Sequence, residues 1–279
     1  MLAKRVLVVV ILLPIGLALI YLGGWAYTGM VALILGLAAW EYARLFRAGG
    51  YQPATYLIVA ASVLLPLARG WVAFSLDGLI LGGFVLVSMA YHVFAYERGR
   101  DQAATDFAIT IAGGVYLGFV GSYLVSLRNL PEGLWWVLLT LPSVWLADSG
   151  AYFIGRSFGR HKMSKRVSPK KSWEGYFGGI VVGIIGTALL AMLWQYLAGQ
   201  WPAKLGSATL ITPLNGAVLG LILSVFTVLG DLGESMIKRQ VGVKDSGSLL
   251  PGHGGVFDRI DSWLWAGIIS YFVVFYFFL

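Results

Sequence analysis

The sequence predicts an all-α, polytopic integral membrane protein: a helical bundle with about nine transmembrane helices. Of the 279 residues, 58% are hydrophobic and only 12% are charged, and the mean hydropathy is +0.80. A water-soluble domain usually carries about 25% charged residues. Long apolar runs also recur along the chain, each near the roughly 20 residues that a helix needs to cross a bilayer. We therefore expect a single integral membrane domain over residues 1–279.

Nine apolar runs account for the predicted spans. Lys4 and Arg5 precede the first run, which we interpret as an uncleaved helix because Gly23 and Gly24 lead directly into the second. Residues 1–130 are expected to supply N-terminal spans and residues 131–279 the catalytic half. The runs lie at about 5–22, 26–46, 54–74, 78–96, 104–127, 134–156, 175–198, 212–237 and 261–279.

The distribution of basic residues predicts the orientation. With nine spans, 17 of the 20 lysines and arginines fall on the side of the N-terminus, and only Arg69, Arg128 and Lys204 fall on the other. Because basic loops stay in the cytoplasm, the N-terminus is predicted to be cytoplasmic and the C-terminus external. The short, cysteine-free chain favours a bacterial cytoplasmic (inner) membrane. Because Arg69 lies on the predicted external side, Arg69→Ala is expected to have almost no effect on the activity of the protein.

Composition also excludes several functions. The chain contains no cysteine, which excludes disulfides, thiolate metal sites and a cysteine nucleophile. The net charge of +7 is assigned to orientation and anionic lipid headgroups, so we expect no nucleic-acid partner. Motifs for a P-loop, a zinc protease or a serine hydrolase are also missing from the sequence.

A polar stripe runs along the eighth predicted span. Asp231 is its centre, because an ionised carboxylate in a membrane is unfavourable unless it is paired, hydrated or bound to a cation. The alternatives are an ion pair with Lys238 or with another helix, or a cytosolic helix end. Spacings of three and four residues place the members on one helical face: Ser224, Thr227, Asp231, Glu234, Ser235 and Lys238.

Two further aspartates begin the last predicted span, after a glycine-rich segment. Asp258 lies 27 positions after Asp231, and a loop that returns to the membrane could bring them together. Asp261 is equally well explained as a helix cap. Carboxylates without cysteine or clustered histidine favour Mg²⁺ over zinc. The candidate metal ligands are Asp231, Asp258 and Glu234.

The same segment carries basic residues and one histidine. The basic side chains either anchor the helices at the membrane or bind phosphate. His253, between glycines, is a candidate for hydrogen bonding to phosphate, for proton transfer or for fixing the loop. The candidate substrate-binding residues of this segment are Ser235, Lys238, Arg239, Lys244, His253 and Arg259.

A second cytosolic loop, from Arg156 to Glu174, carries seven basic residues. Basic loops often bind headgroups without specificity, and Ser172 with Glu174 could simply begin the next helix. However, acids accompany the bases on the same predicted side as the first segment, so the two loops could form one cavity. The candidate substrate-binding residues here are Asp148, Ser168, Lys170, Lys171 and Glu174.

One family resemblance covers both loops. The sequence from Ser235 to Asp261, SMIKRQVGVKDSGSLLPGHGGVFDRID, resembles the signature of the phosphatidate cytidylyltransferases, also called CDP-diacylglycerol synthases. The runs around Asp148 and from Ser168 to Gly175 are also similar to this family, although Ser172 stands where threonine is common. The resemblance extends over the C-terminal half, whereas the first hundred residues match only as apolar spans.

The resemblance implies a nucleotidyltransferase that converts CTP and phosphatidic acid to CDP-diacylglycerol and pyrophosphate at the cytosolic face. It implies a Mg²⁺ centre at Asp231 and Asp258, with a possible second cation such as K⁺, and a possible homodimer among membrane lipids. Both substrates are anionic, so positioning and charge neutralisation dominate such a reaction. The residues expected to carry it are Asp231, Asp258, Lys171, Lys244 and His253.

Two other functions would explain part of the sequence. A cation transporter would explain intramembrane acids such as Asp148, Asp231 and Glu234, but not a long cytosolic loop rich in lysine and glycine. A CTP-dependent lipid kinase, or a synthase for another lipid phosphate, would keep the nucleotide and change the chemistry. Released pyrophosphate distinguishes a cytidylyltransferase from a kinase, which yields CDP, and from a transporter, which yields neither.

Overall fold

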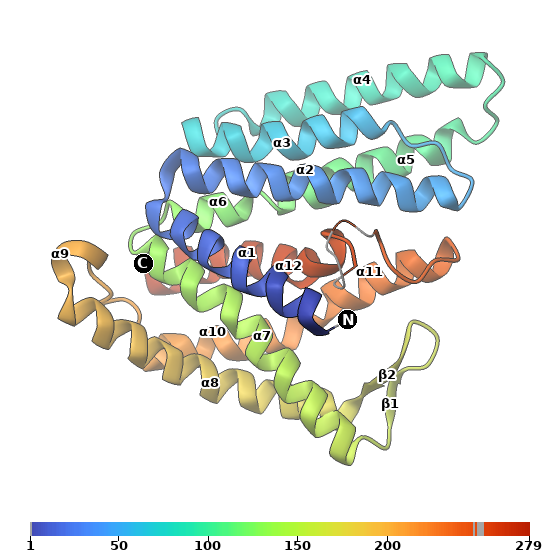
Figure 1. Ribbon diagram of the computed structural model, residues 1–279. Helices are drawn as coiled ribbons and strands as arrows, with labels where there is room; N and C mark the ends of the chain where they lie inside the picture. The colour runs from blue at the N-terminus through green and yellow to red at the C-terminus, as the bar shows by residue number, and fades with distance from the viewer. Residues whose placement is uncertain (1, 248, 250–253) are drawn as a thin grey trace. The chain divides into compact units, whose positions relative to one another are not determined.

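The computed structural model describes residues 2–247, 249 and 254–279 (Figure 1). Helices dominate this part of the chain, as the sequence predicts. The elements are α1 Leu2–Leu22, α2 Gly24–Ala48, α3 Thr55–Val72, α4 Asp77–Glu97, α5 Ala103–Gly113, the π-helix η1 Gly114–Val120, α6 Tyr123–Arg128, α7 Gly133–Phe158, β1 Lys162–Ser164, β2 Ser168–Ser172, α8 Trp173–Gln200, α9 Pro202–Leu205, α10 Pro213–Phe226, α11 Val228–Gln240, α12 Phe257–Val273 and the π-helix η2 Val274–Phe278.

The helices follow the apolar runs closely. Among the described residues, eight helices are long and apolar enough to cross a membrane, and this supports a multi-pass membrane protein. Three of these spans join consecutive elements: α5 with η1 and α6, α10 with α11, and α12 with η2. The ends of all eight helices lie within four residues of the ends predicted from the sequence. The first predicted span corresponds to α1. The count of nine transmembrane helices and the orientation of the chain stay predictions.

Two compact units make up the chain. Unit 1 comprises residues 1–126 and 236–264, and unit 2 comprises residues 127–235 and 265–279. The signature segment, Ser235–Asp261, therefore belongs almost entirely to unit 1, together with the N-terminal spans. Each unit has its own polar cluster, and the two are described separately below.

In unit 1, α3 packs against α2, α4 and η1. Small residues allow these helices to approach closely, as is common in membrane bundles. A Cβ atom at Gly114 would clash with the ring of Phe84, and one at Gly118 would lie 3.0 Å from the carbonyl oxygen of Ala61. The largest fully buried side chains of these helices include Leu35, Ile58, Leu65 and Leu117.

A buried carboxylate organises the loops at one end of unit 1. Asp106 is fully buried and accepts hydrogen bonds from the Nε atom of Arg100 at 2.7 Å and from the backbone N–H of Gln52 at 2.8 Å. Hydrogen bonding to Asp106 raises the pKa of Arg100 above its ordinary value. Because both oxygens of Asp106 have donors, this carboxylate has a structural role.

Arg69 has a structural role that the sequence did not reveal. Arg69 is 1% exposed in α3, and its side chain forms a buried ion pair with Asp77, with 2.7 Å between Nη2 and Oδ2. The guanidinium also donates to Ser126 at 3.1 Å and lies over the rings of Tyr123 and Phe74. The expectation that Arg69→Ala has little effect on activity stays a prediction, but the buried ion pair adds an expected effect on stability.

We expect Arg69→Ala to lower the free energy of unfolding by about 3–5 kcal/mol, because it leaves the Asp77 carboxylate buried without its cation. Thermal unfolding of the detergent-purified protein measures this effect. Lys204→Ala is the matched control, since Lys204 lies exposed in the short helix α9. Equal melting temperatures for the two variants would contradict this assignment.

In unit 2, α7, α8 and α10 pack against one another in pairs. Glycines lie where the helices are closest: a Cβ atom at Gly179 would lie 2.8 Å from the carbonyl oxygen of Ala147, and one at Gly220 would lie 2.5 Å from that of Gly183. Small residues in α8 therefore allow these helices to pack closely.

A short antiparallel hairpin connects α7 to α8. Strands β1 and β2 pair Lys162 with Ser172 and Ser164 with Ser168. The sequence predicts a loop for this segment, so the hairpin is a difference from that prediction. The hairpin holds Lys171 at the end of β2, immediately before the first turn of α8, and thereby positions a basic side chain of the unit 2 cluster.

Candidate functional site

The unit 2 cluster consists of Asp148, Lys171, Asp231 and Ser235. The Nζ atom of Lys171 lies 2.5 Å from Oδ2 of Asp231, and the hydroxyl of Ser235 donates to Oδ1 of Asp231 at 3.3 Å. Asp148, on α7, experiences attraction from Lys171 and repulsion from Asp231. Three elements, α7, β2 and α11, thus bring two acids and one base together.

Asp231 remains accessible although it is paired. Its side chain is 38% exposed, so a cation or a substrate can still reach the carboxylate. The ion-pair alternative is thus correct in part, but the partner is Lys171 from the hairpin. Lys238, seven residues further along the same helix, pairs with Asp258 instead.

The rest of the predicted stripe divides into two groups. Ser224 donates to the carbonyl of Gly220 and Thr227 to that of Leu223, so these hydroxyls satisfy their own helix backbone. Glu234 is 2% exposed and follows Asp231 by three residues on α11. The carboxylates of Asp231 and Glu234 therefore emerge from one helical face.

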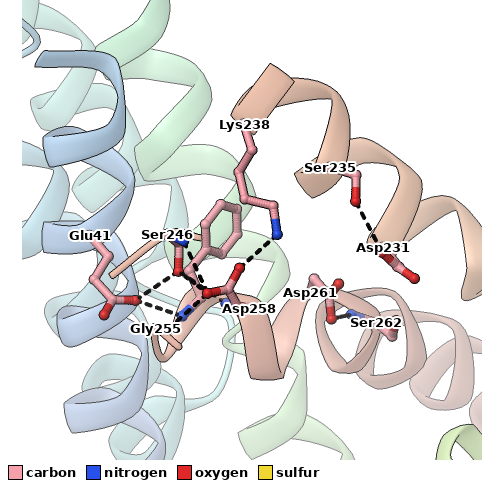
Figure 2. Close-up of polar contacts among 10 residues, drawn as sticks. Glu41, Asp231, Ser235, Lys238, Ser246, Gly255, Asp258, Asp261 and Ser262 are labelled. Carbon is pink, nitrogen blue, oxygen red and sulfur yellow. Dashed lines mark hydrogen bonds and ion pairs between the residues drawn. The ribbon is translucent and has the colours of Figure 1, made fainter. Parts of the chain in front are cut away.

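The unit 1 cluster surrounds Asp258 (Figure 2). Its Oδ2 atom accepts from the backbone N–H of Ser246 at 3.0 Å, from the Ser246 hydroxyl at 2.9 Å and from the N–H of Gly255 at 2.8 Å. Its Oδ1 atom accepts from Nζ of Lys238 at 2.7 Å. Four protein donors therefore hold this carboxylate in one orientation.

The start of α12 explains why an aspartate stands at position 258. The helix begins at Phe257, four residues before the predicted span, so Asp258 lies in its first turn. A carboxylate there is stabilised by the free N–H groups and the helix dipole. Asp261 lies one turn inside the helix and accepts from the N–H of Ser262 at 2.7 Å, so the interpretation of Asp261 as the cap that begins the last helix is wrong.

The glycines of the signature fit the space around this carboxylate. A Cβ atom at Gly255 would clash with the Ser246 hydroxyl and with the carboxylate of Glu41. Gly254 has a φ of 87°, a conformation that side chains rarely adopt. The backbone therefore comes close enough to Asp258 for its N–H groups to bind the carboxylate.

The remaining predicted residues have different surroundings. Glu174 accepts from the backbone N–H groups of Arg160 and His161 at 3.1 Å each, and it contacts the His161 ring, so it fixes the start of the hairpin. Ser172 is the N-cap of α8, which confirms the alternative proposed for it. Ser168 is half-buried in β2, and His253 lies outside the described residues. Four of the predicted basic residues are exposed: Lys170, Arg239, Lys244 and Arg259.

Two residues of the unit 1 cluster escaped the sequence analysis: Glu41 and Ser246. Glu41 is 1% exposed in α2, and its carboxylate accepts from the N–H of Phe257 at 2.9 Å. A signal existed, since Glu41 is the single acidic residue of α2 and an acid within a span is rarely accidental. Ser246 gave no comparable signal, because its role depends on how the loop folds back.

Both clusters combine hard oxygen atoms with lysine ammonium groups. Carboxylates suit a divalent cation that also binds phosphate, and lysines neutralise the negative charge of phosphate groups. These groups suit a reaction between charged phosphates.

Comparison with known proteins gives a consistent result. The sequence profile of the Cytidylyltransferase family matches residues 3–277. A phosphatidate cytidylyltransferase of Synechocystis sp. is 33% identical over 97% of this chain and 96% of its own length. Relatives with the same name from Staphylococcus haemolyticus and Mycobacterium bovis are 34% and 33% identical, over 93% and 95% of this chain and 94% and 87% of their own lengths. The resemblance seen in the two loops thus extends over the whole chain, which belongs to the cytidylyltransferase family.

Proposed function

We propose that this chain is a phosphatidate cytidylyltransferase that transfers CMP from CTP to phosphatidic acid. A phosphate oxygen of phosphatidic acid forms a bond to the α-phosphorus of CTP, the bond to the β-phosphate breaks, and pyrophosphate leaves. The observation that carries this proposal is the full-length similarity to several relatives of this name. The exposed carboxylate of Asp231 and the lysine beside it support it chemically.

The chain's own residues supply charge neutralisation and orientation. Lys171 and Lys170 are proposed to bind the triphosphate or the leaving pyrophosphate, together with Lys244 and Arg259. Lys171 is suited to this role because its side chain is 23% exposed and lies next to the Asp231 carboxylate, which is proposed to bind a cation. Phosphatidic acid carries its own ionised nucleophile, so no side chain has to act as one.

We propose Asp231, Glu234 and Asp258 as ligands of Mg²⁺, with K⁺ as a possible second cation. The donor chemistry fits, because these are hard oxygen atoms in a chain without cysteine. Asp231 fits best, since its carboxylate is partly exposed, whereas Asp258 already accepts from four donors and would share Oδ1 with Lys238. When bound, magnesium would neutralise charge on the reacting phosphates.

Pyrophosphate release is the direct test against the two alternatives. Detergent-purified protein is incubated with CTP, phosphatidic acid and MgCl₂, and the products are identified by mass spectrometry. The proposal predicts CDP-diacylglycerol and pyrophosphate in equal amounts. A lipid kinase would instead release CDP, and a transporter would leave CTP intact; either result would refute the proposal.

The site is proposed to face the cytosol of a bacterial inner membrane. The absence of native cysteine makes this testable, because single cysteines can be introduced at exposed positions. Lys165→Cys, in the hairpin, is expected to react with a membrane-impermeant maleimide only after cell lysis. Lys204→Cys, in α9, is expected to react in intact spheroplasts, and the reverse pattern would contradict this orientation.

The protein is also proposed to form a homodimer among membrane lipids, as the family resemblance implies. Light scattering of the purified protein, corrected for bound detergent, measures its mass against the 30.2 kDa of one chain. A mass of one chain at assay concentrations would refute this part of the proposal.

A further inference from the structure

Glu41 is the most unusual polar residue of unit 1 outside the predicted site. It lies in the apolar helix α2 and is 1% exposed. A buried carboxylate is unfavourable unless hydrogen bonds compensate for the water that it loses. The source of those hydrogen bonds therefore shows what the residue does.

The donors to Glu41 come from the signature segment. Its Oε2 atom accepts from the backbone N–H of Phe257 at 2.9 Å and lies 3.3 Å from the hydroxyl of Ser246. The N–H of Phe257 is one of the first in α12, which have no acceptor within their own helix. Glu41 thus caps the helix that carries Asp258, from a position 216 residues earlier in the sequence.

Ser246 connects Glu41 to Asp258. Its hydroxyl lies 3.3 Å from Oε2 of Glu41 and 2.9 Å from Oδ2 of Asp258, so Ser246 bridges the two carboxylates (Figure 2). The backbone N–H of Ser246 donates separately to Asp258. A displacement of Glu41 would therefore release Ser246 and, through it, two of the four donors to Asp258.

The lack of side chains at two nearby glycines also leaves space for the Glu41 carboxylate. A Cβ atom at Gly247 would clash with Oε1 of Glu41, and one at Gly255 would clash with Oε2. Two glycines of the signature segment therefore leave room for a side chain of α2. This close fit restricts where the backbone on either side of residues 248–253 can lie.

We propose that Glu41 is a positioning residue that fixes Ser246 and the start of α12, and thereby orients Asp258 for the reaction. The inference rests on the proposed function only in that Asp258 takes part in it. Glu41 touches no substrate. Its role gives the N-terminal half, which the sequence analysis could assign only as membrane spans, a direct part in building the site.

Glu41→Gln tests the proposal, because it keeps the size of the side chain and removes the charge. Hydrogen–deuterium exchange is measured on the full-length protein in detergent, in peptides that contain the amides of Ser246, Gly255 and Phe257. Loss of a charge-assisted hydrogen bond is expected to raise exchange at these amides by about tenfold or more. The value of kcat/KM for cytidylyl transfer is expected to fall by at least about tenfold.

Asp106→Asn is the matched control, since Asp106 is an equally buried carboxylate of the same unit with other partners. It is expected to raise exchange near Gln52 and Arg100 and to leave the signature amides and the kcat/KM of the folded protein unchanged. If Glu41→Gln raises exchange equally throughout unit 1, or leaves the signature amides at wild-type rates, the positioning role is refuted.

Ser246→Ala provides a second variant that changes only the loop. It is expected to raise exchange at Gly255 and Phe257, and its effect on kcat/KM should not add to that of Glu41→Gln, because both changes release the same contacts. Fully additive effects would refute the proposed connection. The exchange measurement does not depend on turnover, so an inactive wild-type protein would refute the proposed function and still leave Glu41 tested.

Discussion

Asp258→Asn is expected to lower the rate of CDP-diacylglycerol formation by at least about 100-fold, the scale seen when a charged group of a preorganised site is lost. The reason lies in the four donors around this carboxylate. An amide has one acceptor oxygen, so it cannot receive the Lys238 ammonium on one side and the donors from Ser246 and Gly255 on the other. The measurement is the initial rate per folded protein in membranes and in detergent.

The control for Asp258→Asn is Asp101→Asn. Asp101 is an exposed carboxylate in the turn between α4 and α5, and its loss is expected to leave the rate within about twofold, as for most surface changes. Both variants should insert into the membrane in wild-type amounts, because neither removes apolar surface. Wild-type-like activity in purified Asp258→Asn would remove this residue from the site.

Asp231→Asn is expected to abolish magnesium-dependent turnover, again by at least about 100-fold. The substitution removes the accessible carboxylate of the unit 2 cluster and leaves the Lys171 ammonium without its partner at 2.5 Å. The rate is measured over a range of magnesium concentrations. If Asp231 binds the cation, the residual activity should need far more magnesium than the wild-type protein needs.

Lys171→Met separates charge pairing from cation binding. It breaks the same ion pair as Asp231→Asn but keeps the carboxylate, so it should weaken binding of CTP without raising the magnesium requirement. A magnesium requirement unchanged in Asp231→Asn, or raised equally in both variants, would contradict the assignment of Asp231 as a metal ligand.

The sequence was sufficient to predict the membrane spans and the family. Apolar runs report directly on lipid contact, which is why the ends of the long helices lie within four residues of the predictions. Asp231 and Asp258 could be selected because ionised groups near apolar helices require partners, and the structure provides partners for both.

The sequence did not reveal features that depend on residues far apart in the chain. The ion pair of Arg69 escaped because packing brings its partners, Asp77 and Ser126, to it. The hairpin escaped because β1 and β2 have three and five residues and little apolar alternation. Glu41 escaped because its partners lie 205 and 216 residues away, in a segment whose own acids drew attention first.

The transfer of differently labelled phosphates from CTP to lipid tests the central claim most directly. Purified protein is incubated with phosphatidic acid, magnesium and CTP that carries label in either the α- or the γ-phosphate. Cytidylyl transfer predicts that the α-label enters the lipid fraction and the γ-label leaves as pyrophosphate. Entry of the γ-label into lipid, or no lipid labelling under conditions in which a relative is active, would contradict the proposed function.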